Sequence, residues 1–173
     1  MPTVAKELRY IIFNTDMGWI GILASAKGLL RTTLPRRSAK EAEQLSGHRV
    51  NDATWSTDFF DDLTQRLRTY FGGHRATFPD ELDLSGATAF QREVWKITRL
   101  IPYGEAKSYA WVAEHVGKAG ATRAVGQALA RNPLPIIIPC HRVVANNGKL
   151  GGFSGGVEMK QRLLWLEASA STR

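Results

Sequence analysis

Two prolines, Pro135 and Pro139, enclose three consecutive isoleucines immediately before the only cysteine of the chain, Cys140. Proline lacks a backbone N–H, fixes its own φ near about −65° and restricts the residue before it, so this segment is not expected to form a helix. We therefore expect Cys140 to be held on a stiff, buried, extended segment. The three isoleucines also favour a plainer interpretation, in which the thiol is an inert core residue.

A histidine, His141, follows the cysteine directly. A thiol attacks carbon as its thiolate, and an unperturbed cysteine with a pKa of about 8.5 is mostly protonated near neutral pH. An adjacent base therefore marks Cys140 as a candidate nucleophile. Because the chain has one cysteine, it has no internal disulfide, no resolving thiol and no cysteine-rich zinc cluster.

The positive charge of the chain is unevenly distributed. Residues 1–87 contain 11 basic and 11 acidic side chains, whereas residues 88–173 contain 12 and 5, so the second half holds the whole net charge of +7. A basic half attracts phosphate, although a merely solubilising surface has the same composition. No segment approaches the ~20 apolar residues of a membrane span, and residues 1–9 lack the apolar core of a signal peptide. We expect a cytoplasmic protein that binds no membrane.

Residues 1–87 are predicted to form a small α/β domain that ends in a connecting segment at 74–87. Its strands are expected as an antiparallel meander over residues 8–14, 19–25 and 29–34, separated by turn signals at 16–18 and 27–28. Helices are expected at 38–45 and 58–71. One face of the second helix should carry Phe59, Leu63, Leu67 and either Tyr70 or Phe71.

Residues 88–173 are predicted to form a mainly helical second domain. One helix should present Phe90, Val94, Ile97 and Ile101 on one face, a second should run from a cap at Ser108 to Val116, and a third should cover 121–131. The glycine-containing turn at 117–120 would join the last two as a helix-turn-helix. The third helix has small side chains around Arg123, which permit close approach either to a neighbouring helix or to a DNA groove.

The residues around Cys140 closely resemble the signature of the O6-alkylguanine-DNA alkyltransferases. The matching runs are Pro139–Arg142, Asn132–Pro133 and Ser154–Gly156, and the similarity extends from about Phe90 to Glu167. The resemblance implies a repair protein that transfers the alkyl group of O6-alkylguanine irreversibly to Cys140, once per molecule. It also implies a ribonuclease H-like α/β amino-terminal domain and a winged helix-turn-helix carboxyl-terminal domain.

The same resemblance implies the partners of the protein. Double-stranded DNA containing O6-alkylguanine is the expected partner, and a monomer is expected, with cooperative binding to DNA left open. No cofactor is expected, because the damaged base is itself the alkyl donor, and no metal site is expected.

In this family the third helix enters the minor groove of DNA, and the arginine that matches Arg123 fills the space left by the extruded nucleotide. Extrusion is needed because a thiol in a pocket cannot reach the O6 substituent inside the duplex. The inserted side chain partly offsets the cost of unstacking. The resemblance therefore assigns close contact with DNA to Ala121, Thr122, Ala124 and Gly126.

The resemblance also assigns roles in the chemistry. The sulfur of Cys140 attacks the alkyl carbon, Tyr109 donates to N3 of the departing guanine, His141 takes the thiol proton through a water, and Glu167 orients the imidazole. Arg142 is expected in a structural salt bridge.

Further matches concern the base and its adduct. The carbonyls of Cys140 and Val143 would accept from the exocyclic amine of guanine, and Ser154 would contact O6. Asn132 would tie the helix-turn-helix to the active-site loop, although a helix cap explains it equally well.

The loop 146–156 contains five glycines and is expected to act as a lid. Phe153 stands where many relatives have tyrosine. Pro135 and the lack of bulk at Gly155 predict space for an aromatic adduct.

Three other functions would use some of these features. A cysteine hydrolase also needs a cysteine and a histidine, but it leaves the basic helix-turn-helix unexplained. A DNA-binding regulator with a redox-sensing thiol fits the charge and the helices, yet its cysteine should be exposed. A protein that recognises alkylguanine without repairing it should lack the cysteine.

Overall fold

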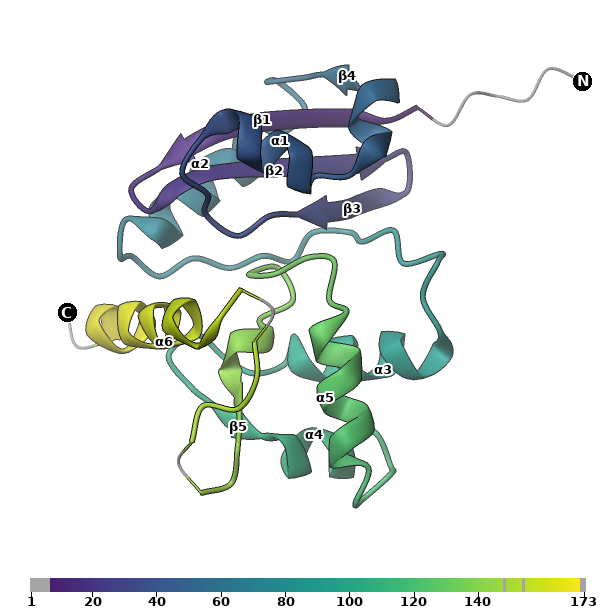
Figure 1. The fold of residues 1–173 in the computed structure, drawn as a ribbon, viewed down its shortest axis with the longest axis vertical. Coiled ribbons are helices and arrows are strands. Elements are labelled where there is room, and N and C mark those ends of the chain that lie inside the picture. Colours follow the sequence, from purple (N-terminus) through teal and green to yellow (C-terminus); the bar gives the residue numbers. More distant parts are fainter. Residues whose placement is uncertain (1–6, 148, 154, 172–173) are drawn as a thin grey trace, which may run out of the picture. The chain divides into compact units, whose positions relative to one another are not determined.

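The computed structural model describes residues 7–147, 149–153 and 155–171. The chain divides into two compact units, whose elements are shown in Figure 1. The first unit comprises residues up to 72 together with 76–84, and the second comprises 73–75 together with residues from 85 onward. Mixed strands and helices in the first unit and mostly helices in the second give a two-domain α/β fold.

The first unit contains a four-stranded sheet of order β3-β2-β1-β4. The strands β1 (Arg9–Thr15), β2 (Gly18–Ser25) and β3 (Gly28–Thr32) form the predicted antiparallel meander. The short strand β4 (Thr54–Trp55) pairs in parallel with β1 and was not predicted, so the sheet is mixed.

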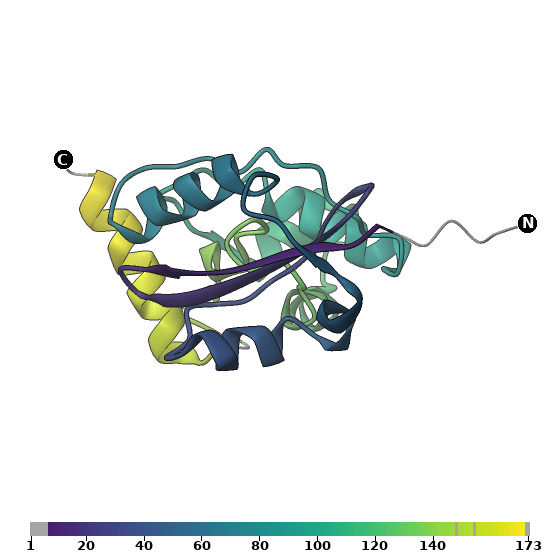
Figure 2. The same cartoon turned by 90° about the horizontal axis from the view of Figure 1, so that it is seen from above.

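Two helices cover opposite faces of this sheet, as the view from above shows (Figure 2). Helix α1 (Ala39–Leu45) lies within the predicted range, and the Ser38 side chain caps it by accepting from the Glu41 N–H at 3.1 Å. A short 3₁₀ helix, η1 (His48–Asp52), follows, and then α2 (Asp61–Phe71). Because both faces are covered, the central strand β2 is almost continuously buried.

The prediction that Phe59 belongs to the buried face of this second helix was wrong. Helix α2 begins only at Asp61, so Phe59 precedes it and is 48% exposed, whereas Phe60 is 1% exposed. Helical spacing does not predict which side chains are buried in the residues that precede a helix. Of the two adjacent phenylalanines, Phe60 therefore packs into the core and Phe59 does not.

The segment 76–84 follows the edge of β3 within the first unit. The Leu29 N–H donates to the Glu81 carbonyl at 2.9 Å, and the Asp83 N–H donates to the Leu29 carbonyl at 2.8 Å. Arg66 of α2 anchors the segment through Asp80, with an N–O distance of 2.7 Å. The segment therefore covers an edge strand whose N–H and C=O groups would otherwise be open.

The second unit contains four α-helices, α3 (Ala89–Thr98), α4 (Tyr109–His115), α5 (Thr122–Ala130) and α6 (Val157–Ser171). It also has a parallel pair of short strands, β5 (Lys107–Ser108) and β6 (Val143–Val144), and a 3₁₀ turn, η2 (Cys140–Arg142). Neither strand was predicted. The part of the chain that the structure describes has no helix long and apolar enough to cross a membrane.

The first three of these helices lie close to their predicted positions. The Ser108 side chain accepts from the Trp111 N–H at 3.0 Å, which is the predicted cap of α4. Helix α3 packs on α5 through Trp95, whose indole N–H donates to the Ala128 carbonyl at 2.9 Å. The turn between α4 and α5 includes Gly117 and Gly120, both at positive φ. A helix-turn-helix arrangement of α4 and α5 results.

Candidate functional site

The segment before the cysteine is buried as predicted, but it is a turn rather than an extended strand. Ile136 has a φ of +74°, the Ile138 N–H donates to the Leu134 carbonyl at 2.8 Å, and Pro135 and Ile138 form an isolated bridge. The two prolines stiffen the ends of this turn without extending it. Cys140 then opens η2 with 6% of its surface exposed.

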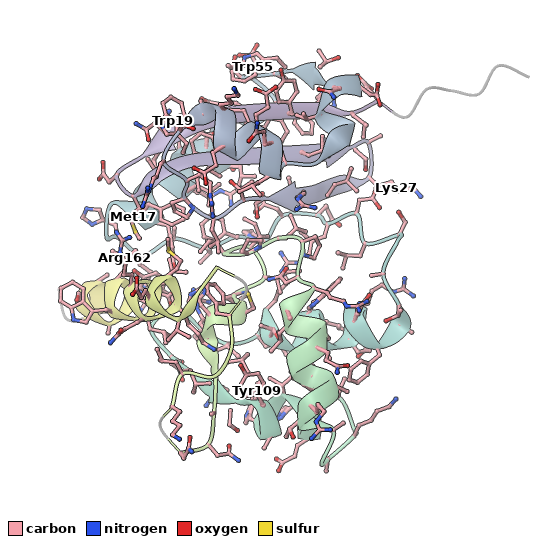
Figure 3. The ribbon with its side chains drawn as sticks, viewed as in Figure 1. Met17, Trp19, Lys27, Trp55, Tyr109 and Arg162 are labelled. Atoms are coloured by element: carbon pink, nitrogen blue, oxygen red, sulfur yellow. The ribbon has the colours of Figure 1, made fainter. Side chains whose placement is uncertain are left out.

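A cavity of about 700 Å³ reaches the Cys140 thiol. Its walls come from α4, α5 and the loop before α6, and they include Tyr109, Arg123, Gln127 and Phe153. In Figure 3 Tyr109 lies between α5 and that loop. A buried thiol in the wall of a cavity beside a helix-turn-helix is suited to meet a group carried on DNA.

His141 and Arg142 share one buried carboxylate, Glu167 of α6. The His141 Nε2 lies 2.5 Å from Glu167 Oε2, and Arg142 donates from Nε at 2.8 Å and from Nη2 at 3.2 Å. The backbone N–H of Gly104 donates to the same carboxylate at 3.1 Å, and Arg142 Nη1 donates to the Ile101 carbonyl at 2.8 Å. The salt bridge expected of Arg142 is confirmed.

The electrostatics of this cluster follow from burial and pairing. Burial alone would raise the pKa of Glu167, but the hydrogen bonds and charges of His141 and Arg142 lower it to about 2. Burial lowers the pKa of His141, and Glu167 opposes that effect. Arg142 is charged at all relevant pH values, so Glu167 is ionised whichever state His141 adopts.

Asn132 connects the end of α5 to the cysteine turn. Its Nδ2 donates to the Ile138 carbonyl at 2.9 Å, and its Oδ1 accepts from the Leu134 N–H at 2.8 Å. Its side chain also acts to lower the pKa of the Cys140 thiol. One amide therefore fixes the turn and favours the thiolate.

The adjacent His141 is not the main group that lowers the pKa of the Cys140 thiol. Burial raises the pKa of Cys140, and the groups that oppose this effect most are the Asn132 side chain and the charge of Lys160. A thiolate at this depth therefore depends on a cation that comes from α6.

Lys160 is the functional candidate that the sequence analysis missed. Its side chain is fully buried, and Nζ donates to the Val143 carbonyl at 2.6 Å and to the Gly152 carbonyl at 3.2 Å. Burial lowers the pKa of Lys160 to about 8, against the opposing charge of Cys140. The signal was helical spacing, because Lys160 lies seven residues before Glu167 and so on the same face of α6.

The loop before α6 closes against Tyr109. The Tyr109 hydroxyl lies 3.4 Å from the Gly152 carbonyl and 3.5 Å from Lys160 Nζ. Gly151 has a φ of +75°, and a Cβ there would lie 2.6 Å from the Tyr109 hydroxyl, so a larger residue would strain the backbone and displace the Tyr109 ring. Burial raises the pKa of Tyr109, with the Cys140 charge adding to the effect, so the hydroxyl remains a protonated donor.

The predicted site residues differ in how they meet the cavity. Six of the predicted site residues line it, namely Cys140, Tyr109, Phe153, Thr122, Arg123 and Gly126. The other predicted residues near the thiol do not line the cavity, namely His141, Glu167, Asn132 and Val143.

Four further predicted positions do not line the cavity, namely Pro135, Gly155, Ala121 and Ala124. Ser154 lies outside the described residues. Within those residues, no group of three or more histidine, cysteine, aspartate or glutamate side chains is placed to hold a metal ion.

The fold and the site define a protein in which a helix-turn-helix and a buried cysteine share one cavity, and comparisons with known proteins connect this arrangement with DNA. Residues 89–169 match the model of the 6-O-methylguanine DNA methyltransferase, DNA binding domain. A methylated-DNA–protein-cysteine methyltransferase of Mycobacterium bovis is 48% identical over 117 residues, which are 66% of this chain and 70% of that protein. One of Methanosarcina acetivorans is 38% identical over 160 residues, covering 92% and 98% of the two chains.

A solved structure gives the same result for the fold. The crystal structure of Mycobacterium tuberculosis OGT in complex with DNA superposes with a TM-score of 0.78 and 37% identity, covering 94% of each chain. This chain therefore belongs to the methylated-DNA–protein-cysteine methyltransferase family.

Proposed function

We propose that this protein repairs O6-alkylguanine in double-stranded DNA by transferring the alkyl group to its own Cys140. The observation that carries the proposal is the position of the buried thiol, in a cavity that is also lined by Arg123 of α5. The match to a DNA-binding domain covers both features.

In the transfer, the thiolate sulfur of Cys140 bonds to the alkyl carbon while the bond between that carbon and O6 breaks. The electron pair of the broken bond goes to guanine, which would be a poor leaving group as an anion and therefore takes up a proton. Tyr109 supplies this donor at N3, since its hydroxyl faces the cavity and remains protonated. The thioether is stable and no second cysteine exists, so each molecule acts once.

The thiol proton passes to His141. Glu167 holds Nε2 of the imidazole, which leaves Nδ1 as the nitrogen that takes the proton, through a water. The proton gained by guanine equals the proton lost by the thiol, so the overall transfer is balanced. Lys160 supports the thiolate until the sulfur is alkylated.

The guanine is held by main-chain carbonyls. The Val143 carbonyl already accepts from Lys160, and its second lone pair is available to the exocyclic amine of the base. Ser154 is assigned the contact with O6 by sequence match alone. Pro135 and Gly155 do not line the cavity, so they carry no part of this proposal.

DNA is engaged by α4, the glycine turn and α5, which we assign as a winged helix-turn-helix. Arg123 fills the space of the extruded nucleotide. The small side chains beside it allow α5 to approach the DNA closely, and they are those of Ala121, Thr122, Ala124 and Gly126. We assign both DNA binding and alkyl transfer to residues 88–173. The first domain is assigned as ribonuclease H-like from its strand order, with β4 parallel to β1.

The rival functions fit the site less well. A redox sensor needs an accessible thiolate, whereas the thiol is 6% exposed and burial raises its pKa. A cysteine hydrolase leaves unexplained both the helix-turn-helix and the arginine of α5 in the cavity wall.

Replacing Cys140 tests the proposal. Cys140→Ser is expected to bind duplex DNA containing O6-methylguanine but to transfer no methyl group, because a serine hydroxyl is far less acidic than a thiol. Intact-protein mass after incubation reports the transfer, and a DNA titration reports the binding. Methyl transfer by Cys140→Ser would refute the assignment of the nucleophile.

A further inference from the structure

Helix α5 presents one stripe of side chains to the cavity, formed by Thr122, Arg123, Gly126, Gln127 and Ala130. Most of these are small. Arg123 and Gln127 are the two long polar exceptions, and four-residue spacing places them on the same face of the helix. Both are exposed.

Gln127 has no structural task in the folded protein. Within the part of the chain that the structure describes, its side-chain amide makes no hydrogen bond. The other long amide near the site, Asn132, is fully used by the cysteine turn. An exposed amide at the mouth of a cavity, one turn from the DNA-inserting arginine, is positioned to contact what the cavity receives.

The reach of Gln127 follows from helix geometry and rests on the proposed function. Four residues of α-helix rise about 6 Å. Base pairs are stacked about 3.4 Å apart. If Arg123 occupies the space of the extruded nucleotide, the Gln127 amide lies one to two steps away, at a base pair that flanks the lesion.

The chemistry of the amide then selects a flanking base. In the minor groove every base pair presents acceptors, but only guanine adds a donor, its exocyclic amine. A glutamine side chain has both an acceptor oxygen and two N–H donors. It can therefore accept from guanine N2 and donate to guanine N3 together, whereas an A·T pair leaves its oxygen without a donor.

We propose that Gln127 is a specificity-determining residue, which favours repair of O6-alkylguanine flanked by a G·C pair. The stacking of the DNA has the opposite effect on the repair rate. A nucleotide between A·T pairs is less strongly stacked, so it costs less to extrude and should be repaired faster. The effect of Gln127 must therefore be measured against a variant that lacks the amide.

The test uses two duplexes with one O6-methylguanine each, flanked on both sides by G·C pairs or by A·T pairs. Single-turnover methyl-transfer rates are measured below saturation for the intact protein, for Gln127→Leu and for Gln161→Leu, an exposed glutamine of α6 outside the cavity wall. The readout is the G·C to A·T rate ratio, which a uniform loss of activity does not change.

We expect this ratio to fall about fivefold or more in Gln127→Leu and to stay unchanged in Gln161→Leu. Equal ratios in the intact protein and Gln127→Leu would overturn the inference while leaving the proposed function intact. If the intact protein transferred no methyl group from the G·C-flanked duplex and none from the A·T-flanked duplex, the proposed function would be overturned, and this inference with it.

Discussion

The buried carboxylate of Glu167 offers a quantitative test of the cluster behind the thiol. Glu167→Gln keeps the shape of the side chain but removes its charge. The substitution also places an amide N–H₂ donor where the carboxylate accepted hydrogen bonds from His141 or Arg142, so one donor would face another. Breaking a buried ion pair by neutralising one partner costs roughly 3–5 kcal/mol, because the remaining charge stays buried.

An independent route gives a similar magnitude. The pKa of Glu167 falls from an ordinary 4.5 to about 2, and each unit corresponds to about 1.36 kcal/mol, so the folded state favours the ionised form by about 3 kcal/mol. Since the folded-state pKa is the lower one, this stabilisation is present above about pH 4.5. It is lost as the pH falls toward 2.

Urea unfolding followed by tryptophan fluorescence and circular dichroism measures the effect. At pH 7 we expect Glu167→Gln to lower the free energy of unfolding of the second domain by about 3 kcal/mol, and the difference should shrink as the pH falls below 4.5. The matched control is Glu158→Gln, an exposed position of the same helix, which should change stability by less than about 0.5 kcal/mol. A loss below about 1 kcal/mol at pH 7, or a difference independent of pH, would refute the reasoning.

Two further substitutions separate binding, extrusion and thiol chemistry. Arg123→Ala should slow repair of duplex DNA far more than reaction with free O6-methylguanine base, because only the duplex leaves a space to fill, and equal slowing on both would show that Arg123 is structural. Lys160→Met should slow transfer at pH 7 about tenfold for each unit by which the pKa of Cys140 rises. The rate of this variant should keep increasing with pH, whereas the intact protein should lose support for its thiolate as Lys160 deprotonates near pH 8. Identical pH–rate profiles would exclude Lys160 from thiolate stabilisation.

The elements predicted from the sequence were those with local signals. The strands β1 to β3 have apolar runs with turn residues between them, and Ser108 acts as the predicted helix cap. The strand β4 has two residues and forms only because β1 is beside it, so no local pattern identifies it. The same holds for the parallel pair β5 and β6.

The site shows the same limit. The motif around Cys140 predicted a buried thiol, but no local pattern predicted the turn with a positive φ at Ile136. Lys160 was overlooked because a lysine is normally assigned to the surface, and only its packed position on α6 shows that the charge is buried. Whether a charged side chain is buried depends on how the helices pack. The sequence periodicity of α6 indicates only which residues share a face of the helix.

The central claim is that Cys140 receives one alkyl group and keeps it. The most direct measurement is an incubation of the protein with a large excess of duplex DNA carrying labelled O6-methylguanine, followed by intact-protein mass and peptide mapping over time. We expect the label to reach a plateau at one methyl group per chain, all of it on Cys140, with an equal amount of guanine restored in the DNA. Continued release of methyl from the DNA after that plateau, or label on any other residue, would contradict the account.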